Sequence, residues 1–449
     1  MSMPPEVVGP LVRGLSVLRA LAAAGGRRRV SELARETGLA RSAADRVVST
    51  LSQLGYLRLD GGAASMAPRL MELGNAYLAA CRVPARLGPL AERLATELDE
   101  SVVLAVPDGG GLRLVYRSAT RRAMSASFGV GDIVCLDEPG LVAVSACTSD
   151  GVVVSVVGAQ PLGSAVRRRL EETVAEMEAA PYAEDEEPAW EPRGPLGPGA
   201  NESLARGLAV LATLDRPRTL SGAAQVTGLA PATVRRSLIT LEHLGYVAAS
   251  GRLFAPTPRV LDLGFAPLSR LTFEQLARPH LEELVARVHE SASAAVLCGP
   301  DIQYVARVPT VRIMSVNLMV GTRLPAHCTA MGRVLLAGLP ADRRLDGIHP
   351  RALTPRTVTS PDALGELLDQ VARDGYALVD GELEEGLRSV AVPVRGRGGE
   401  VVAAINVAMH AGLPMDAGLL PNLLAAAAAI EADLRVAVRA AGRPGSVWW

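Results

Sequence analysis

The stretch RSLITLEHLGYV, from Arg236 to Val247, has the same skeleton as RVVSTLSQLGYL, from Arg46 to Leu57. Both stretches contain Arg, then Thr-Leu, then Leu-Gly-Tyr, at identical spacing. With an offset of 190 residues the match extends as far as Gly131, which aligns with Gly321. A match this long and colinear indicates an internal duplication.

The sequence around the second stretch predicts a compact helical unit with a small sheet. LARGLAVLATL places Leu at helical spacing on one face, which predicts an amphipathic helix. TLSGAAQVTGLA predicts a short helix that is capped by Thr219 or Ser221 and ends at Gly228. A third helix begins at Pro231, and VAASGRLFAPTPRVLDLG predicts two strands joined by a Gly turn. This order of elements is that of a winged helix-turn-helix.

The third helix of this unit carries the side chains expected to contact DNA. A helix of this diameter fits the major groove of B-DNA, with its N-terminal half facing the base edges. We expect Arg235 and Arg236 to reach phosphates or guanine, Thr233 and Thr240 to contact phosphates, and Arg252 in the wing to reach a phosphate or the minor groove. The alternative is a winged helix used only for protein contact, with the arginines on a solvated face.

The first copy predicts the same arrangement with two differences. Its first loop is longer and carries three consecutive arginines, 27–29, which either hold phosphates or form a solvated turn. Asp45 stands where the second copy has Arg235, and a carboxylate repels phosphate although it accepts a hydrogen bond from cytosine N4. The first copy therefore either reads a different half-site or binds weakly. Its candidate DNA-binding residues are Arg41, Ser42, Arg46, Thr50 and Arg69.

Composition limits the other classes of function. The net charge of the 449 residues is −1, so any nucleic-acid contact must come from a local basic surface. The five cysteines are scattered and form no C-x-x-C motif, so we expect no disulfide framework, no metal site and no cofactor. The N-terminus lacks a signal-peptide pattern, and the most apolar stretch, LLPNLLAAAAAIEADL, is short for a membrane span. We expect a cytoplasmic protein without a membrane partner.

The repeat divides the chain into five segments. A stretch rich in Pro, Gly and acidic residues separates the copies and predicts a linker. After the colinear part, Gly140 aligns with Gly332 and Val152 with Val401, so the first copy lacks about 57 residues, equivalent to 343–399. The predicted segments are a winged helix at 8–78, a truncated sheet domain at 84–180, the linker at 181–202, a second winged helix at 203–268 and a complete sheet domain at 272–440.

Three motifs of the second copy carry a resemblance to a known family. They are RGLAVL…GAAQVTGLAPATVRRSLITLEHLGYV, VGTRLPAHCTAMGRVLLAGLP and DGYALVDGELEEGLRSVAVPVRGRGGEVVAAINVAMH. The chain resembles the IclR family of bacterial transcriptional regulators over about 203–440, and looks most like the branch that controls protocatechuate, 4-hydroxybenzoate and β-ketoadipate catabolism. Ordinary members have one copy, so the tandem arrangement departs from the family. The resemblance implies an α+β chain with two winged helix-turn-helix domains and two GAF-like α/β effector domains, the first truncated.

The resemblance also implies a small-molecule pocket in the second copy. Two carboxylates beside an anionic effector are unusual, so Asp380 and Glu382 either orient backbone amides, accept from ligand hydroxyls or face solvent. Arg323 or Arg388 either balances the ligand charge or pairs with a neighbouring acid. The first copy lacks the equivalent of DGELEEGLRS, so we expect its sheet domain to bind no effector and to act structurally. The implied effector-binding residues are Met314, Thr329, Ala330, Asp380, Glu382, Leu387, Ser389 and Asn406.

The leading hypothesis is a metabolite-responsive transcription factor. Its partners would be double-stranded DNA, read at a pseudo-palindromic operator by an intramolecular pseudo-dimer, and an aromatic acid or dicarboxylate effector; a further homodimer is left open. The alternative is a ligand-sensing scaffold whose winged helices mediate dimerisation. We expect no enzyme, because the chain has no G-x-S-x-G, P-loop or H-E-x-x-H motif and Cys328, next to His327, is its only candidate nucleophile.

Overall fold

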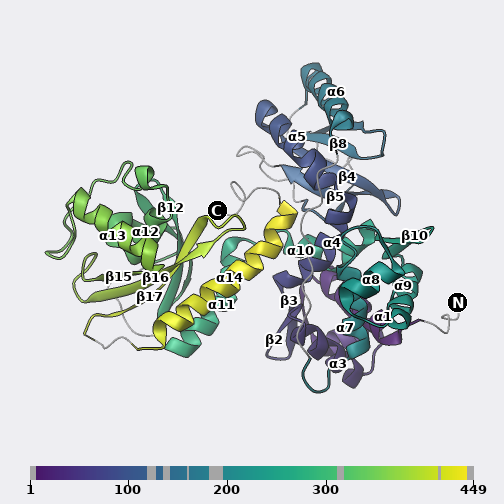
Figure 1. Cartoon of the computed structure of the whole chain (residues 1–449), viewed down its shortest axis with the longest axis horizontal. Helices are drawn as coiled ribbons and strands as arrows, with labels where there is room; N and C mark the ends of the chain where they lie inside the picture. Colours follow the sequence, from purple (N-terminus) through teal and green to yellow (C-terminus); the bar gives the residue numbers. More distant parts are fainter. Residues whose placement is uncertain are drawn as a thin grey trace. The chain divides into compact units, whose positions relative to one another are not determined.

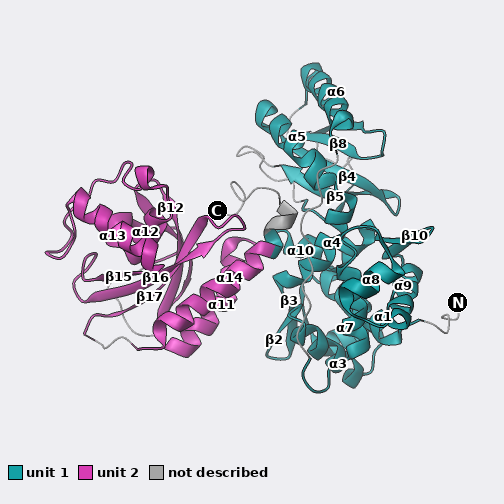
Figure 2. Ribbon diagram, viewed as in Figure 1, with its two compact units in different colours: residues 1–270, 436–447 teal, residues 271–435, 448–449 magenta. Residues whose placement is uncertain are grey.

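In the residues that it describes, the computed structural model shows helices and four antiparallel sheets (Figure 1). It describes residues 7–118, 128–134, 142–158, 161–181, 196–310, 318–412 and 416–441. The chain forms two compact units, one of residues 1–270 with 436–447 and the other of residues 271–435 with 448–449 (Figure 2). The predicted linker falls largely on 182–195, and the Gly140 alignment on 135–141, both outside the described residues.

The first winged helix is the N-terminal part of the first unit. Gly38 ends its second helix in the left-handed conformation (φ 67°), which a glycine adopts without strain. The three consecutive arginines, predicted as a loop, instead form a short strand that pairs with β3 in a sheet of order β1-β3-β2. The elements are α1 (Gly9–Ala23), β1 (Arg27–Arg29), α2 (Val30–Thr37), α3 (Arg41–Gln53), β2 (Leu57–Asp60) and β3 (Ala63–Met66).

The second winged helix repeats this order of elements. Thr219 caps α8 by accepting a hydrogen bond from the Gly222 amide (3.1 Å), and Gly228 ends the helix at φ 67°, as predicted. Val234, Leu238 and Leu241 of α9 are buried, which confirms the predicted apolar face of that helix. The elements are α7 (Glu202–Ala212), β9 (Arg218–Thr219), α8 (Leu220–Thr227), α9 (Pro231–His243), β10 (Val247–Ser250) and β11 (Leu253–Pro256).

The two winged helices pack against each other through equivalent residues. The motif LVRG in α1 matches LARG in α7, so Leu11 is equivalent to Leu204 and Gly14 to Gly207. A Cβ added at Gly14 would overlap the Leu204 side chain, and one added at Gly207 would overlap that of Leu11. Each glycine therefore makes room for the leucine of the other copy, and the contact is reciprocal.

A connector follows each winged helix, and the first leads into a five-stranded sheet. The strand order is β6-β5-β4-β8-β7. The first connector and its sheet domain comprise η1 (Pro68–Leu70), α4 (Met71–Cys81), α5 (Val83–Leu98), β4 (Ser101–Asp108), β5 (Gly111–Ser118), β6 (Ile133–Val134), β7 (Val142–Cys147), β8 (Val153–Gly158) and α6 (Ser164–Ala179). The second connector comprises η2 (Pro258–Leu263) and α10 (Phe265–Leu268).

The second unit contains a six-stranded sheet of order β14-β13-β12-β17-β16-β15. Helices α12 and α13 lie on one side of this sheet, and α11 and α14 lie on the other (Figure 1). Among the described residues, none of the helices combines the length and the apolarity that crossing a membrane would require. The elements are α11 (Phe273–Val288), β12 (Ser291–Cys298), β13 (Asp301–Val308), β14 (Arg323–Pro325), η3 (Ala326–Cys328), α12 (Ala330–Ala337), η4 (Ala341–Arg343), α13 (Pro361–Asp374), β15 (Ala377–Asp380), β16 (Leu387–Arg395), β17 (Val401–His410) and α14 (Leu419–Ala441).

The length difference between the two sheets lies earlier than predicted. Residues 135–141 separate β6 from β7, whereas 326–386 separate β14 from β16, which is 7 residues against 61. The strand β16, which falls inside the predicted gap of 343–399, has β7 as its counterpart beside β8. The predicted gap position was wrong because the copies share too little sequence there to fix it. The extra residues of the second copy supply α12, α13 and β15.

Candidate functional site

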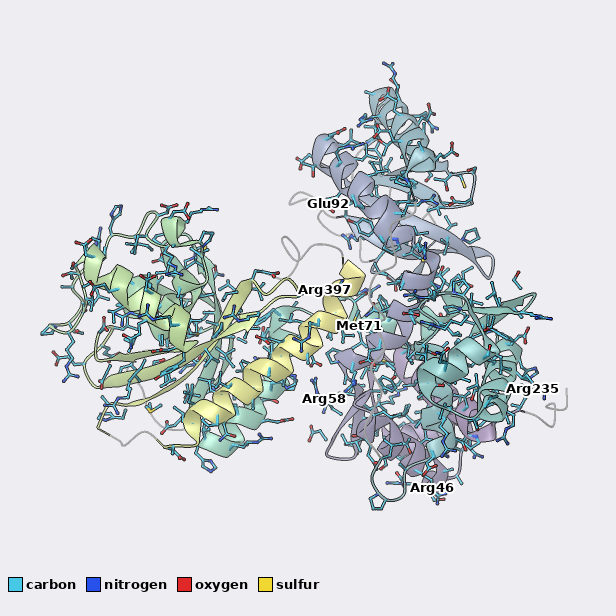
Figure 3. All side chains as sticks on the ribbon, in the orientation of Figure 1. Arg46, Arg58, Met71, Glu92, Arg235 and Arg397 are labelled. Atoms are coloured by element: carbon cyan, nitrogen blue, oxygen red, sulfur yellow. The ribbon has the colours of Figure 1, made fainter. Side chains whose placement is uncertain are left out.

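The second winged helix exposes a set of basic side chains on α9 and on its wing. Arg235, in the N-terminal half of α9, is exposed (Figure 3). Arg236 of the same helix is also exposed, and Thr233 is half-buried. Arg252 is exposed at the turn between β10 and β11. This places cations on both the helix and the wing, the two elements that a winged helix presents to DNA.

The first winged helix has a less basic version of this surface. Arg46 of α3 is exposed (Figure 3), and so are Arg41 and Ser42. Arg41 Nε, however, lies 3.7 Å from Asp45 Oδ2. Arg69, beyond the wing, is paired with Glu72 (3.0 Å). The carboxylate of Asp45 therefore offsets one of the cations of α3.

Two predicted phosphate contacts, Thr50 and Thr240, are corrected by the structure. Both side chains are fully buried. The Thr240 hydroxyl accepts a hydrogen bond from the Val8 amide (2.9 Å), and that of Thr50 accepts one from the Asn201 amide (2.9 Å). Each hydroxyl therefore binds the backbone just before the first helix of the other winged helix. The prediction of DNA contact was wrong for both residues.

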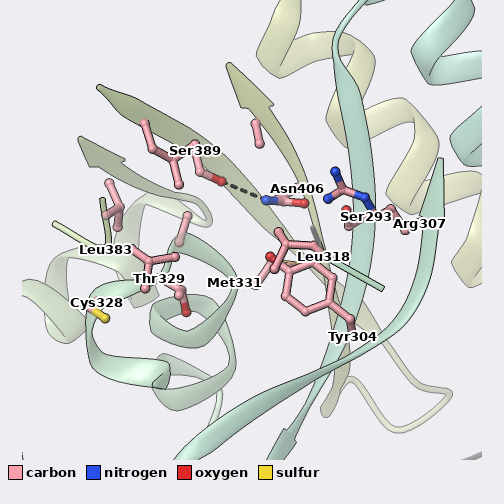
Figure 4. A pocket seen from close by; sticks show the side chains of 14 residues that line it. Ser293, Tyr304, Arg307, Leu318, Cys328, Thr329, Met331, Leu383, Ser389 and Asn406 are labelled. Carbon is pink, nitrogen blue, oxygen red and sulfur yellow. Dashed lines mark hydrogen bonds between the residues drawn. The ribbon is translucent and has the colours of Figure 1, made fainter. Parts of the chain in front are cut away.

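The second unit contains a cavity between its sheet and α12 (Figure 4). The free volume inside it is small, about 30 Å³, and the rest of the space between its walls opens to solvent. Five of the predicted effector-binding residues lie in its wall: Thr329, Ala330, Leu387, Ser389 and Asn406. Thr329 uses its hydroxyl to cap α12, accepting from the Gly332 amide (3.1 Å). The predicted Met314 lies outside the described residues.

The two predicted carboxylates are bound to arginines instead of lining the cavity. Asp380 Oδ2 accepts from Arg388 Nη2 (2.6 Å), and its other oxygen lies 3.4 Å from Arg356 Nη1. Glu382 Oε2 accepts from Arg333 Nη2 (2.6 Å). Neither acid is among the described residues that line the cavity, so their prediction as ligand contacts was wrong. The open alternative that Arg388 pairs with a neighbouring acid is confirmed.

The buried pair of Arg333 and Glu382 instead holds the cavity wall together. Their side chains are only 4% and 11% exposed. Arg333 Nε also donates to the His327 carbonyl (3.1 Å), and Glu382 Oε2 accepts from the Val358 amide (3.2 Å). The backbone carbonyl of Glu382 accepts from Thr357 Oγ1 (2.6 Å). The pair thus ties α12 to the loop after β15, which carries Glu382, and to the loop before α13, which carries Val358. Val379 of β15 and Leu383 of the loop after it line the cavity.

A polar row across the sheet was missed by the sequence analysis. Asn406 pairs with Ser293 across β17 and β12, and Ser293 pairs with Arg307 across β12 and β13. All three side chains line the cavity and lie side by side (Figure 4). Asn406 Nδ2 donates to Ser389 Oγ (2.8 Å), whereas the buried Asn406 Oδ1 has no partner among the described residues. The row therefore presents a cation and an unused acceptor to the cavity.

The other newly found wall residues are mainly apolar. Tyr304, the exception, is buried, and burial raises the pKa of its hydroxyl to about 12, so this group is a neutral donor. The alternation of side chains along β12 and β13 is a sequence signal for two of the missed wall residues, Ser293 and Arg307. Residues paired across neighbouring strands lie on the same face of the sheet. The remaining lining residues are Leu318, Cys328, Met331, Val379, Leu383 and Ala408.

Cys328 is expected to react slowly with alkylating reagents. Burial, assisted by the negative charge of Glu382, raises the pKa of its thiol to about 11. The ring of His327 is bound to the backbone of Arg351 through Nε2 (3.3 Å from the amide nitrogen). Since the thiolate is the nucleophile, a rise from about 9 to 11 leaves about a hundredfold less of it at pH 8.

Mass spectrometry after iodoacetamide treatment measures this difference. We expect modification of Cys328 to be slow at pH 8 and to accelerate as the pH rises toward 11, while the exposed Cys147 is the internal control. Burial of the neutral thiol stabilises the fold fully below the ordinary pKa of about 9, and this contribution is lost as the pH rises through 11. Equal modification rates at pH 8 would contradict a protected thiol.

The equivalent arginine of the first sheet is bound to the backbone. Arg117, which aligns with Arg307, donates from Nη1 to the Phe128 carbonyl (2.7 Å). Burial lowers the pKa of Arg117, and the nearby charge of Arg270 acts in the same direction. Val103 stands at the position of Ser293 and belongs to an apolar cluster with Leu114. The first sheet therefore replaces part of the polar row by apolar packing.

Two family models match parts of the chain. The model of the IclR helix-turn-helix domain matches residues 10–61 and 203–251, and that of the bacterial transcriptional regulator IclR C-terminal domain matches 265–432. The Pca regulon regulatory protein of Pseudomonas putida is 44% identical over 235 residues, which is 50% of this chain and 81% of the relative.

Two further similarities concern an activator and a solved structure. The p-hydroxybenzoate hydroxylase transcriptional activator of Acinetobacter baylyi is 35% identical over 214 residues, 45% of this chain and 79% of the relative. A solved transcriptional regulator from Rhodococcus sp. RHA1 is 48% identical, with a TM-score of 0.49, and the match covers 53% of this chain and 99% of that one. The two curated relatives are regulators of transcription, not enzymes.

Proposed function

The chain belongs to the IclR family of bacterial transcriptional regulators, and from this premise we propose that it is a pseudo-dimer in one chain, whose two winged helices read the two halves of one operator. In this proposal residues 8–78 and 203–268 are the two DNA-reading domains, and 272–440 form the domain that senses a small molecule. The linker at 181–202 joins the copies, and the truncated domain at 84–180 binds no effector.

The reciprocal packing of α1 and α7 is the observation that carries this proposal. Leu11 packs over Gly207 as Leu204 packs over Gly14. In the same reciprocal way, the buried hydroxyl of Thr50 accepts from the Asn201 amide, and that of Thr240 accepts from the Val8 amide. An isologous contact of this kind relates two units by an approximate twofold axis. Two winged helices related by a twofold axis suit half-sites about one helical turn apart on B-DNA.

The two half-sites of the operator are expected to differ. The exposed residues available for DNA contact in the second winged helix include Arg235, whereas the equivalent residue of the first is Asp45. A gel-shift titration on the DNA upstream of the chain's own operon, at increasing salt, tests the proposal. We expect binding that weakens steeply with salt, because phosphate contacts release counterions. Absence of binding at low salt would favour the scaffold alternative.

We propose a hydroxylated aromatic acid as the effector. The regulators named above control a Pca regulon and p-hydroxybenzoate hydroxylase, respectively. The cavity supports this class of ligand chemically, since Arg307 supplies a cation for a carboxylate and Asn406 Oδ1 supplies an acceptor for a hydroxyl proton. Apolar side chains such as Leu318 and Met331 form the wall that a ring would contact.

Replacing Arg307 by Gln is expected to weaken effector binding by about tenfold to a hundredfold, because a charge-assisted hydrogen bond contributes about 1.5–3 kcal/mol. Thermal shifts of the full chain with 4-hydroxybenzoate, protocatechuate, benzoate and succinate measure the effect. The matched control is Arg117→Gln, at the equivalent position of the first sheet. A benzoate shift as large as that of 4-hydroxybenzoate would contradict the role of Asn406, and a response to succinate alone would favour a dicarboxylate.

A further inference from the structure

One loop of the first sheet lies directly against the second connector. Ser269 Oγ donates to the Val130 carbonyl (3.0 Å), and Arg270 forms an ion pair with Asp132. Gly131, at φ 96°, lies so close that an added Cβ would come within 3.1 Å of the Ala266 backbone nitrogen. Backbone, hydroxyl and charge therefore all contribute to this contact within the first unit.

A buried arginine of the sheet forms the centre of the same contact. Arg113 of β5 is 3% exposed, and its Nη1 lies 2.7 Å from Asp262 Oδ1 in the connector. The same nitrogen donates to the Gly131 carbonyl (2.8 Å), and Nε donates to Asp108 Oδ2 (2.7 Å). Because the guanidinium is out of water, losing one of its carboxylates would leave a buried charge with less compensation.

The residues of this contact are not repeated in the opposite pairing of sheet and connector. In the opposite pairing, at the offset of 190 residues, Gln303 and Thr322 of the second sheet stand in place of Arg113 and Asp132. In the first connector, Ala80 stands in place of Arg270. Asp262 becomes Glu72, which is bound to Arg69 within its own connector. The sequence therefore encodes both ion pairs only for the first sheet with the second connector.

We propose that the first sheet is a docking domain whose partner is residues 262–270 of the same chain, which are the end of the second connector and the two residues that follow it. The dock ends at Arg270, and the second unit begins at the next residue, Leu271. The dock thus fixes the connector where the ligand-binding unit is attached. This role rests on the proposed function. Because the dock holds the connector in place, a ligand-linked change in the second unit is transmitted through the connector to the winged helices.

A designed disulfide tests whether the dock forms in solution. A Cβ at Gly129 would lie 2.9 Å from Ser269 Oγ, which suits a disulfide between cysteines at these two positions. In the full chain carrying Gly129→Cys and Ser269→Cys, we expect mild oxidation to yield this cross-linked peptide in mass spectrometry. Adding Asp262→Arg, which places a second cation at Arg113, should slow the cross-link by about tenfold or more.

The matched control is Glu72→Arg, the same change at the equivalent position of the first connector. It should leave the cross-linking rate unchanged. Failure of the parent pair to cross-link, or equal rates with and without Asp262→Arg, would overturn the dock.

The role of the dock is tested by operator binding of Asp262→Arg without the added cysteines. We expect its affinity without ligand to stay within about threefold of the parent, while the ligand-induced change in affinity falls to about a fifth or less. A full ligand response in a variant that has lost the dock would overturn the role. A parent that cross-links but binds no DNA would overturn the proposed function and leave the dock itself supported.

Discussion

Replacing Arg333 by Met is expected to lower the free energy of unfolding of the second unit by about 3–5 kcal/mol, because Glu382 would remain as a buried charge without its partner. The pair joins α12 to the loop after β15 and to the loop before α13, so the loss should be local to the cavity wall at first. Hydrogen exchange of peptides covering 330–337 and 377–387, together with urea unfolding of the full chain followed by circular dichroism, measures the effect.

Two further variants decide whether the buried charge is the cause. The double variant Arg333→Met with Glu382→Leu should recover most of the lost stability, since an apolar pair of similar size needs no compensation. Arg343→Met, which breaks an exposed pair with Asp346 (both 70% exposed), should change stability little. Equal losses in the single and the double variant would show that packing, and not charge, explains the role of Arg333.

Replacing Arg235 by Asp is expected to weaken operator binding by about tenfold to a hundredfold, because it removes a contact of about 1–3 kcal/mol and adds repulsion from phosphate. The change gives α9 the residue that α3 carries at Asp45. The reverse change, Asp45→Arg, should strengthen binding and steepen its salt dependence by about one phosphate contact. Fluorescence anisotropy with a labelled operator at several salt concentrations measures both.

The control for these variants is Arg168→Asp, which makes the same change of charge at an exposed position of α6, away from both winged helices. It should alter binding only through the net charge of the chain. Variants at Arg235 and Asp45 that behave like Arg168→Asp would exclude α9 and α3 as the DNA-reading helices.

Local sequence was sufficient where local interactions decide the structure. The cap at Thr219, the left-handed Gly228 and the apolar face of α9 follow from rules that span a few residues. Thr240 shows the limit of such rules. Its place on the helix suggested a polar face. Its hydroxyl instead accepts a hydrogen bond from the backbone amide of Val8, which is 232 positions away in the sequence.

The cavity shows the same limit for charged residues. The acidic loop could be located from its motif, but the partner of Glu382 could not, because Arg333 is 49 residues away on another element. Arg307 was overlooked because its significance depends on strand order, which brings it beside Ser293 and Asn406. Sequence pattern thus identified the elements around the cavity, and their pairing determined which side chains face it.

The reciprocal contact of Gly14 with Leu204 and of Gly207 with Leu11 has a consequence for inheritance. In a homodimer one gene encodes both sides of the interface, so each mutation of an interface residue changes both sides at once. One side therefore cannot change while the other stays the same. In this chain the two sides are encoded separately. Each half of the contact is therefore free to acquire substitutions of its own. Under the proposed function, the two winged helices can then diverge in the DNA sequence that each one reads while the contact between them is kept.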